Sequence, residues 1–199
     1  MRLFIGKGAT TRLNFIRILI CSAGLFVAFG LSANDTDLLA LLSSGNHFGF
    51  MRHSTAPGSD DPPNFQIGIC DTQRNLSTGG REQAIAIGEK LRANGIVNAR
   101  VISSQWCRCL DTAELLEIGS IEELALLNSL VSYPGQGRAM TQNLAAWIAD
   151  QDLSQPTLLV SHQINIGALL RSGADEGDIL IVHRQPNGAL AVTGVLRAN

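Results

Sequence analysis

Two histidines and two arginines of this sequence lie at or just beyond the ends of apolar runs that predict strands. One run ends in Arg52 and His53, a second ends in His162, and a third is followed a few residues later by Arg108. Parallel strands of an open α/β sheet end at one common edge, and such sheets bind their ligands beyond the carboxyl ends of the strands. We therefore expect these four side chains to converge at a single site.

This combination of side chains suits phosphoryl transfer. Forked guanidinium groups match phosphate oxygens, so two arginines beside two histidines make a cradle for a dianion. A neutral imidazole held in that cradle can attack phosphorus and form a phosphohistidine that water then hydrolyses. The nearby cations disfavour the imidazolium and keep His53 nucleophilic, while His162 and the arginines stabilise charge on the equatorial oxygens.

The strands that carry these residues alternate with helices. Apolar periodicity and cap residues predict helices over residues 35–42, 77–94, about 105–118, 139–149 and 164–170. They also predict one strand that runs from Phe48 into Arg52 and His53, and further strands over residues 101–104 and 156–161. Residues 124–127 are either a strand or a helical turn, and residues 178–183 and 189–196 predict a terminal hairpin. This alternation favours an α/β fold, a three-layer α/β/α sandwich with a mostly parallel central sheet.

The first 33 residues have the layout of a secretory signal peptide. Four basic residues precede or begin the apolar stretch 16–31, which ends in small residues at Ser32 and Ala33. A retained membrane anchor is the alternative interpretation. We expect a domain over residues 34–199 that is periplasmic or secreted and that contacts a membrane only through an uncleaved signal segment.

The charge of that domain excludes one class of partner. Removing four of the 15 basic residues leaves 11 against 17 acidic residues, a net charge of −6. A domain this acidic is unsuited to binding nucleic acid. Any anion that it binds must be held by a local cluster of arginines.

Three cysteines remain in the domain, and one disulfide is expected if the protein is exported. Cys107 and Cys109 are too close in sequence to pair easily, so Cys70 is expected to pair with either of them. The alternative is that all three are small buried apolar side chains. Zinc-ligand spacings of the Cys-x-x-Cys or His-x-x-x-His kind are absent from the sequence, so we expect no metal and no other cofactor.

Four segments in order resemble the histidine phosphatase superfamily, which includes the phosphoglycerate mutases. Arg52-His53-Ser54 resembles the family's Arg-His-Gly signature, and residues 75–84, 103–113 and 159–163 resemble its next three motifs. The resemblance covers residues 47 to about 170 and implies a phosphoglycerate mutase-like fold and a phosphoric monoester hydrolase. It also implies that His53 is the phosphorylated nucleophile and that Arg52, Arg108 and His162 form the phosphate pocket.

Two departures from the family pattern concern substrate binding and the general acid. Ser54 replaces the signature glycine, and the positions at which the two branches of the family carry an acid hold Ser129 and Gln163. The loop over residues 54–76 is long enough to predict a functional role. The carboxylates that could replace the missing acid are Asp60 and Asp61 of this loop, ranked first, and Glu122 and Glu123.

Further candidates and alternatives follow from the same residues. Arg74 and Arg81, with Ser54, are candidate substrate contacts, whereas His47 and His183 are expected to be structural. The substrate is expected to be a small phosphomonoester such as a phosphosugar, because the exported chain resembles periplasmic lipopolysaccharide core heptose phosphate phosphatases. The alternatives are a mutase, a phosphohistidine or protein phosphatase, and a non-catalytic binder of phosphate ligands that lacks the acid.

Overall fold

The computed structural model of the protein describes residues 34–198, so the predicted signal peptide lies outside the described residues. The strands are β1 (His47–Arg52), β2 (Ala99–Ser103), β3 (Gly119–Glu123), β4 (Thr157–Ser161), β5 (Ile179–Arg184) and β6 (Leu190–Leu196). The α-helices are α1 (Asp35–Leu42), α2 (Thr78–Ala93), α3 (Cys107–Leu116), α4 (Gly137–Ala149) and α5 (Gln163–Leu170). Three short 3-10 helices are η1 (Cys70–Thr72), η2 (Ala125–Leu127) and η3 (Leu130–Ser132).

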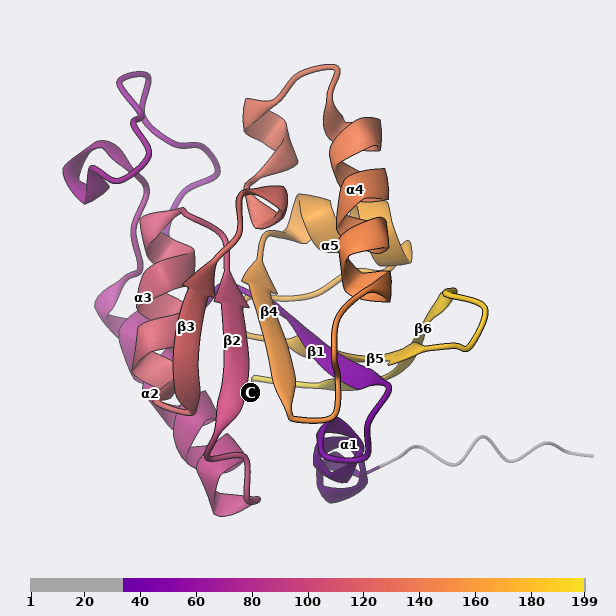
Figure 1. The fold of residues 1–199 in the computed structure, drawn as a ribbon. Coiled ribbons are helices and arrows are strands. Elements are labelled where there is room, and N and C mark those ends of the chain that lie inside the picture. The colour runs from indigo at the N-terminus through magenta and orange to yellow at the C-terminus, as the bar shows by residue number, and fades with distance from the viewer. Residues whose placement is uncertain (1–33, 199) are drawn as a thin grey trace, which may run out of the picture. The chain divides into compact units, whose positions relative to one another are not determined.

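The strands form one sheet in the order β3-β2-β4-β1-β5-β6 (Figure 1). β1, β2, β3 and β4 pair in parallel, and β5 and β6 add an antiparallel hairpin beside β1. The predicted mostly parallel sheet and terminal hairpin are therefore confirmed. The carboxyl ends of the four parallel strands lie at one edge, as the argument for a common site requires.

Helices cover both faces of the sheet, because successive strand residues point to opposite sides. Phe50 packs into a core with α4 and α5, whereas its neighbour Met51 packs into a second core with α1, α2 and α3. The same alternation separates Leu159 from Val160 in β4. These two cores are the packing of a three-layer α/β/α sandwich, which confirms the expected architecture.

The structure resolves one ambiguity and corrects one omission. Residues 125–127 form the 3-10 helix η2, so the helical turn was the right alternative for this segment. The strand β3 lies just before it and was not predicted. All five of its residues are exposed at the edge of the sheet, and its sequence contains only one large apolar residue, Ile121. An edge strand with no buried face lacks the apolar run that signals a strand.

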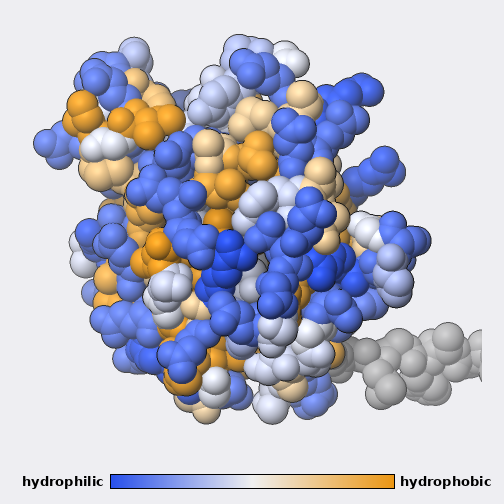
Figure 2. All heavy atoms as spheres, in the orientation of Figure 1, coloured by the Kyte–Doolittle hydropathy of each residue, from blue (hydrophilic) through white to orange (hydrophobic). Residues whose placement is uncertain are grey.

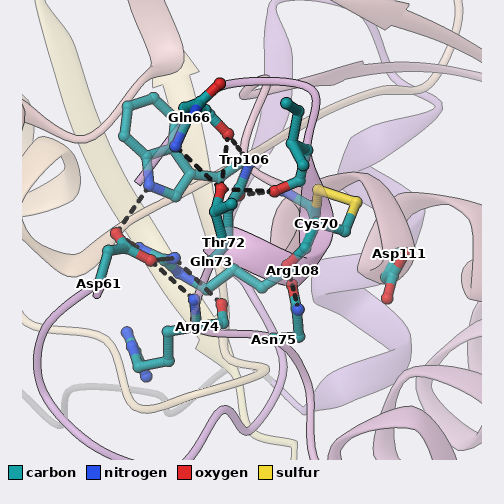
Figure 3. The surroundings of a disulfide bond; sticks show 12 residues. Asp61, Gln66, Cys70, Thr72, Gln73, Arg74, Asn75, Trp106, Arg108 and Asp111 are labelled. Atoms are coloured by element: carbon teal, nitrogen blue, oxygen red, sulfur yellow. Dashed lines mark hydrogen bonds and ion pairs between the residues drawn. A yellow bond between two sulfur atoms is a disulfide. The ribbon is translucent and has the colours of Figure 1, made fainter. Parts of the chain in front are cut away.

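A disulfide ties the long loop after β1 to the start of α3. Cys70 pairs with Cys107, which selects one of the two pairings that the sequence left open, and Cys109 is free and buried (Figure 3). In the surface view, apolar residues gather at the upper left, where this loop lies (Figure 2). The loop includes two exposed apolar side chains, Ile67 and Ile69. No helix within residues 34–198 is long and apolar enough to cross a membrane.

Replacing Cys70 and Cys107 together with serine is expected to lower the free energy of unfolding by about 3 to 4 kcal/mol. The disulfide closes a sequence separation of 37 residues, and the chain-entropy relation gives about that loss for a loop of this length. Urea unfolding of the oxidised wild type and the double variant measures it. Dithiothreitol should bring the wild type to the stability of the variant and leave the variant unchanged; equal stability of the two oxidised proteins would contradict the prediction.

Candidate active site

One pocket gathers the four residues that the sequence placed at strand ends. Arg52 ends β1 and His53 follows it, His162 follows β4, and Arg108 lies in the first turn of α3. All four line a pocket of about 240 Å³, together with Arg74 from the long loop. The expected convergence at the sheet edge is therefore seen, and Arg74 joins it.

Glycine at position 80 lets α2 approach the turn that carries His53. Ser77 caps α2 by accepting a hydrogen bond from the Gly80 N–H. A Cβ at Gly80 would lie 2.0 Å from the carbonyl oxygen of Thr55, two residues beyond His53. A larger residue there would push the helix away from the turn, so the glycine helps to fix the position of the nucleophile candidate.

His53 is held as a neutral imidazole. Its side chain is buried, with 2% exposed, and its Nδ1 lies 2.8 Å from the carbonyl oxygen of Ser54. A carbonyl can only accept, so Nδ1 carries the proton and Nε2 keeps its lone pair. Burial, followed by the charges of the three neighbouring arginines, lowers the pKa of His53 from 6.5 to about 3, despite the hydrogen bond to Ser54.

His162 has the opposite tautomer. Its Nδ1 lies 3.4 Å from Arg108 Nη2, which can only donate, so the proton lies on Nε2. Nε2 in turn lies 3.0 Å from Ser104 Oγ, and Ser104 donates to Asn128 Oδ1 over 3.2 Å. Burial, then the Arg108 charge, lowers the pKa of His162 well below its ordinary value. The two imidazole rings meet edge to face, with centroids 5.5 Å apart.

Acidification is expected to destabilise the wild type more than a His53→Asn variant. The pKa of His53 is about 3 in the folded protein and 6.5 in the unfolded chain, so the unfolded chain takes up the proton first. Its contribution to stability is full above about pH 6.5 and is lost at about 1.4 kcal/mol per pH unit as the pH falls toward 3. Urea unfolding between about pH 7 and about pH 5 measures the difference; equal slopes in both proteins would contradict it.

The three arginines of the pocket have donors that no described residue satisfies. The Nε atoms of Arg52, Arg74 and Arg108 are each buried and lack a hydrogen-bond partner within residues 34–198. The buried hydroxyl of Ser54, next to His53, also has no hydrogen-bond partner among these residues. Buried polar groups without partners are rare and call for an explanation. An oxyanion bound in the pocket would supply acceptors for such donors.

Two carboxylates hold the arginines in place. Asp61 Oδ1 lies 2.8 Å from Arg108 Nη1, and the Trp106 indole donates to Asp61 Oδ2 over 2.9 Å (Figure 3). Burial opposes ionisation of Asp61, but the hydrogen bonds from Trp106 and Arg108 outweigh it and lower its pKa. Asp61 is therefore an ionised partner of Arg108. A second carboxylate, Glu176, pairs with Arg52 at 3.2 Å and lies 4.0 Å from Arg74.

The remaining acid candidates lie outside the pocket. Asp60 is exposed and accepts from Ser59, while Glu122 pairs with Arg100 at the outer edge of the sheet. Glu123, also on β3, accepts from Gln105 at 3.3 Å. No carboxylate is among the residues of the described chain that line the pocket, whereas Ser129 and Gln163 both line it.

Sequence reasoning placed some residues well and missed others. Arg81, a candidate substrate contact, is half exposed and pairs with Asp111 at 2.8 Å, away from the pocket lining. Glu176 and Asn128 were not predicted. Glu176 lies in a loop without a recognisable motif, so its pairing with Arg52 had no local signal. Asn128 directly precedes Ser129, a position at which the family carries an acid, and this was the available clue.

Solved histidine phosphatases share the fold of this chain. The protein histidine phosphatase SixA, solved with tungstate, is 18% identical over 76% of this chain and 97% of its own, with a TM-score of 0.57. A protein of Mycobacterium tuberculosis is 21% identical over 77% of this chain and 99% of its own, with a TM-score of 0.58.

A third structure shares the fold. A mycobacterial glucosyl-3-phosphoglycerate phosphatase, solved with VO3, is 17% identical over 75% of this chain and 99% of its own, with a TM-score of 0.53. No protein-family model and no curated protein matches the sequence. These likenesses establish the fold; the chemistry of the site is argued from its own residues.

Proposed function

We propose that this protein is a metal-independent phosphatase that hydrolyses a small phosphomonoester through a phosphohistidine formed on His53. The observation that carries the proposal is the pairing of a neutral His53 with three buried arginine Nε donors that lack partners within the described residues. The first group is a nucleophile and the others bind oxyanions. Two structures with this fold were solved with the oxyanions tungstate and VO3, which supports a phosphate-like ligand for this chain.

The reaction follows in two steps. In the first, the Nε2 lone pair of His53 attacks phosphorus, the bond to the leaving oxygen breaks, and that oxygen takes a proton from solvent water. In the second, a water molecule attacks phosphorus and gives one proton back to the solvent, the P–N bond breaks, and inorganic phosphate leaves with neutral His53 restored. The guanidinium groups of Arg52 and Arg108 stabilise charge on the equatorial oxygens, and the hydrogen bond to Ser54 keeps Nδ1 of His53 protonated throughout.

A second candidate is a phosphohistidine phosphatase. One observation favours it: Ser129 and Gln163 line the pocket where the family carries its acid, and no described carboxylate lines it. A leaving group that departs without strong acid assistance, such as the imidazole of a phosphohistidine or the carboxylate of an acyl phosphate, suits such a site. The fold likeness to a protein histidine phosphatase is in keeping with this substrate class.

We also propose that the active protein is exported. The predicted signal peptide motivates the proposal, and the Cys70–Cys107 disulfide supports it because disulfides persist in oxidising compartments. An exported enzyme could act on a phosphosugar of the cell envelope, such as a heptose phosphate. This substrate rests on resemblance to periplasmic phosphatases, and the panel below tests it.

A substrate panel separates the candidates. The full chain is assayed with p-nitrophenyl phosphate, phosphoramidate, acetyl phosphate and a set of sugar phosphates. Turnover of all of them supports the general phosphatase. Turnover limited to the first three, which have good leaving groups, favours the phosphohistidine class. Binding of vanadate without turnover of any substrate would overturn both and indicate a non-catalytic phosphate binder.

A further inference from the structure

A second cleft adjoins the candidate active site. It has a volume of about 690 Å³ and is formed by η3, the segment 133–135, the start of α4 and one side of α5. Val131 and Ile164 line both this cleft and the His53 pocket, so the two spaces adjoin at these side chains. Both side chains are unusually exposed for their type, at 69% and 45%. These two side chains therefore form an apolar border between the His53 pocket and the second cleft.

Two arginines line this cleft, and the charge pattern of the domain sets them apart. Eight of the 11 basic residues within 34–198 form ion pairs with carboxylates. A ninth, Arg184, donates to three backbone carbonyl groups at the end of α4. Arg138 and Arg171 are the two that have no side-chain partner among the described residues, and both line the same cleft. No carboxylate of the described chain lines it.

Local structure favours a cation at only one of these two positions. Arg138 lies in the first turn of α4, where the positive end of the helix dipole disfavours a cation. Arg171 caps the C-terminus of α5, where the helix dipole favours a cation, but its backbone φ of 53° is one that favours glycine or asparagine. Two unpaired cations that line one cleft in an acidic domain, one of them at a helix end that disfavours a cation, point to an anionic ligand.

We propose that this cleft is the leaving-group subsite of the enzyme and that it takes a substrate whose leaving group carries a second phosphate. The scissile phosphate lies in the His53 pocket, the body of the leaving group covers Val131 and Ile164, and Arg138 and Arg171 bind the distal phosphate. This inference rests on the proposed function, because the proposed function assigns the scissile phosphate to the arginines around His53 and so sets the orientation of the substrate.

Titration calorimetry with non-hydrolysable ligands tests the subsite without relying on turnover. The full chain is titrated with alkyl monophosphonates and with α,ω-alkyl bisphosphonates of matched and increasing chain length. At the length that spans both sites, the bisphosphonate is expected to bind about tenfold or more tightly than its monophosphonate, the effect of one or two charge-assisted hydrogen bonds. No such advantage at any length would overturn the subsite.

Variants attribute the advantage to the two arginines. Arg138→Ala combined with Arg171→Asn, which suits the backbone at that position, should reduce the bisphosphonate advantage to about onefold. Both side chains are exposed, and each single variant is titrated as well, so the test does not depend on the double variant folding. Lys90→Ala removes a cation that pairs with Asp35 and should keep the full advantage. An unchanged advantage in the double variant would overturn the assignment.

A parallel assay with p-nitrophenyl phosphate separates the two proposals. Turnover of this substrate with no bisphosphonate advantage would overturn the subsite alone. A bisphosphonate advantage that depends on Arg138 and Arg171, without turnover of any substrate in the panel, would support the subsite and overturn the phosphatase.

Discussion

Replacement of His53 by alanine is expected to abolish turnover of p-nitrophenyl phosphate, with kcat/KM falling by roughly ten-thousandfold or more. His53 is the nucleophile in the proposed reaction, and no other group can take its place: His162 Nε2, the protonated nitrogen, points to Ser104, and its Nδ1 lies against Arg108. Steady-state kinetics measure the loss. Acid quenching after incubation with a ³²P-labelled substrate should recover acid-labile phosphate on the wild type and none on the variant.

A second histidine provides the matched control. His183 lies on β5 and stacks on His47, with ring centroids 4.7 Å apart, and neither lines the His53 pocket. His183→Ala should therefore keep both turnover and covalent label within a few-fold of the wild type. Equal covalent label on the His53→Ala protein would refute the assignment of the nucleophile, whatever its turnover.

Replacement of Arg108 by lysine is expected to lower kcat/KM by about a hundredfold. Arg108 is 3% exposed and contacts Asp61, the Arg74 carbonyl oxygen and His162 Nδ1 at the same time. Lysine keeps the charge but cannot donate along those separate directions while also binding a phosphate oxygen. Kinetics and the inhibition constant for vanadate measure the effect. Arg100→Lys, at an arginine that pairs with Glu122 outside the pocket, is the matched control.

Replacement of Asp61, the ion-pair partner of Arg108, distinguishes a positioning role of this carboxylate from a role in proton transfer. Asp61→Asn removes the charge that holds Arg108 and should lower kcat/KM by about tenfold, to the same extent for aryl and alkyl phosphates. A general acid would behave differently, because its loss harms poor leaving groups far more than good ones. A loss confined to alkyl phosphates would return Asp61 to the role of acid and contradict its place as a partner of Arg108.

The parts of the site that the sequence predicted are those that depend on local order. Arg52 and His53 directly follow an apolar strand, so the pattern that predicts the strand also places the side chains at its end. The same holds for His162 after β4. Arg108 required one further step, the helix that begins at Cys107. Such positions can be read along the chain without knowledge of tertiary contacts.

The missed parts depend on contacts between distant segments. Asp61 and Arg108 are 47 residues apart, and Glu176 pairs with Arg52 across more than a hundred residues. An ion pair of this kind has no sequence period and no fixed spacing. The sequence alone therefore fits a loop carboxylate equally well as a general acid or as the ion-pair partner of an arginine. Only the folded loop shows that Asp61 is held ionised by Trp106 and Arg108.

The two carboxylates beside the arginines have a consequence for turnover. Three guanidinium groups without counterions would bind inorganic phosphate tightly, and product release would then limit the rate, as it does in many enzymes. Asp61 and Glu176 reduce the net charge of this cluster from +3 to +1. The cluster can still hold an ester in place for attack, while each molecule of inorganic phosphate leaves against a weaker electrostatic attraction.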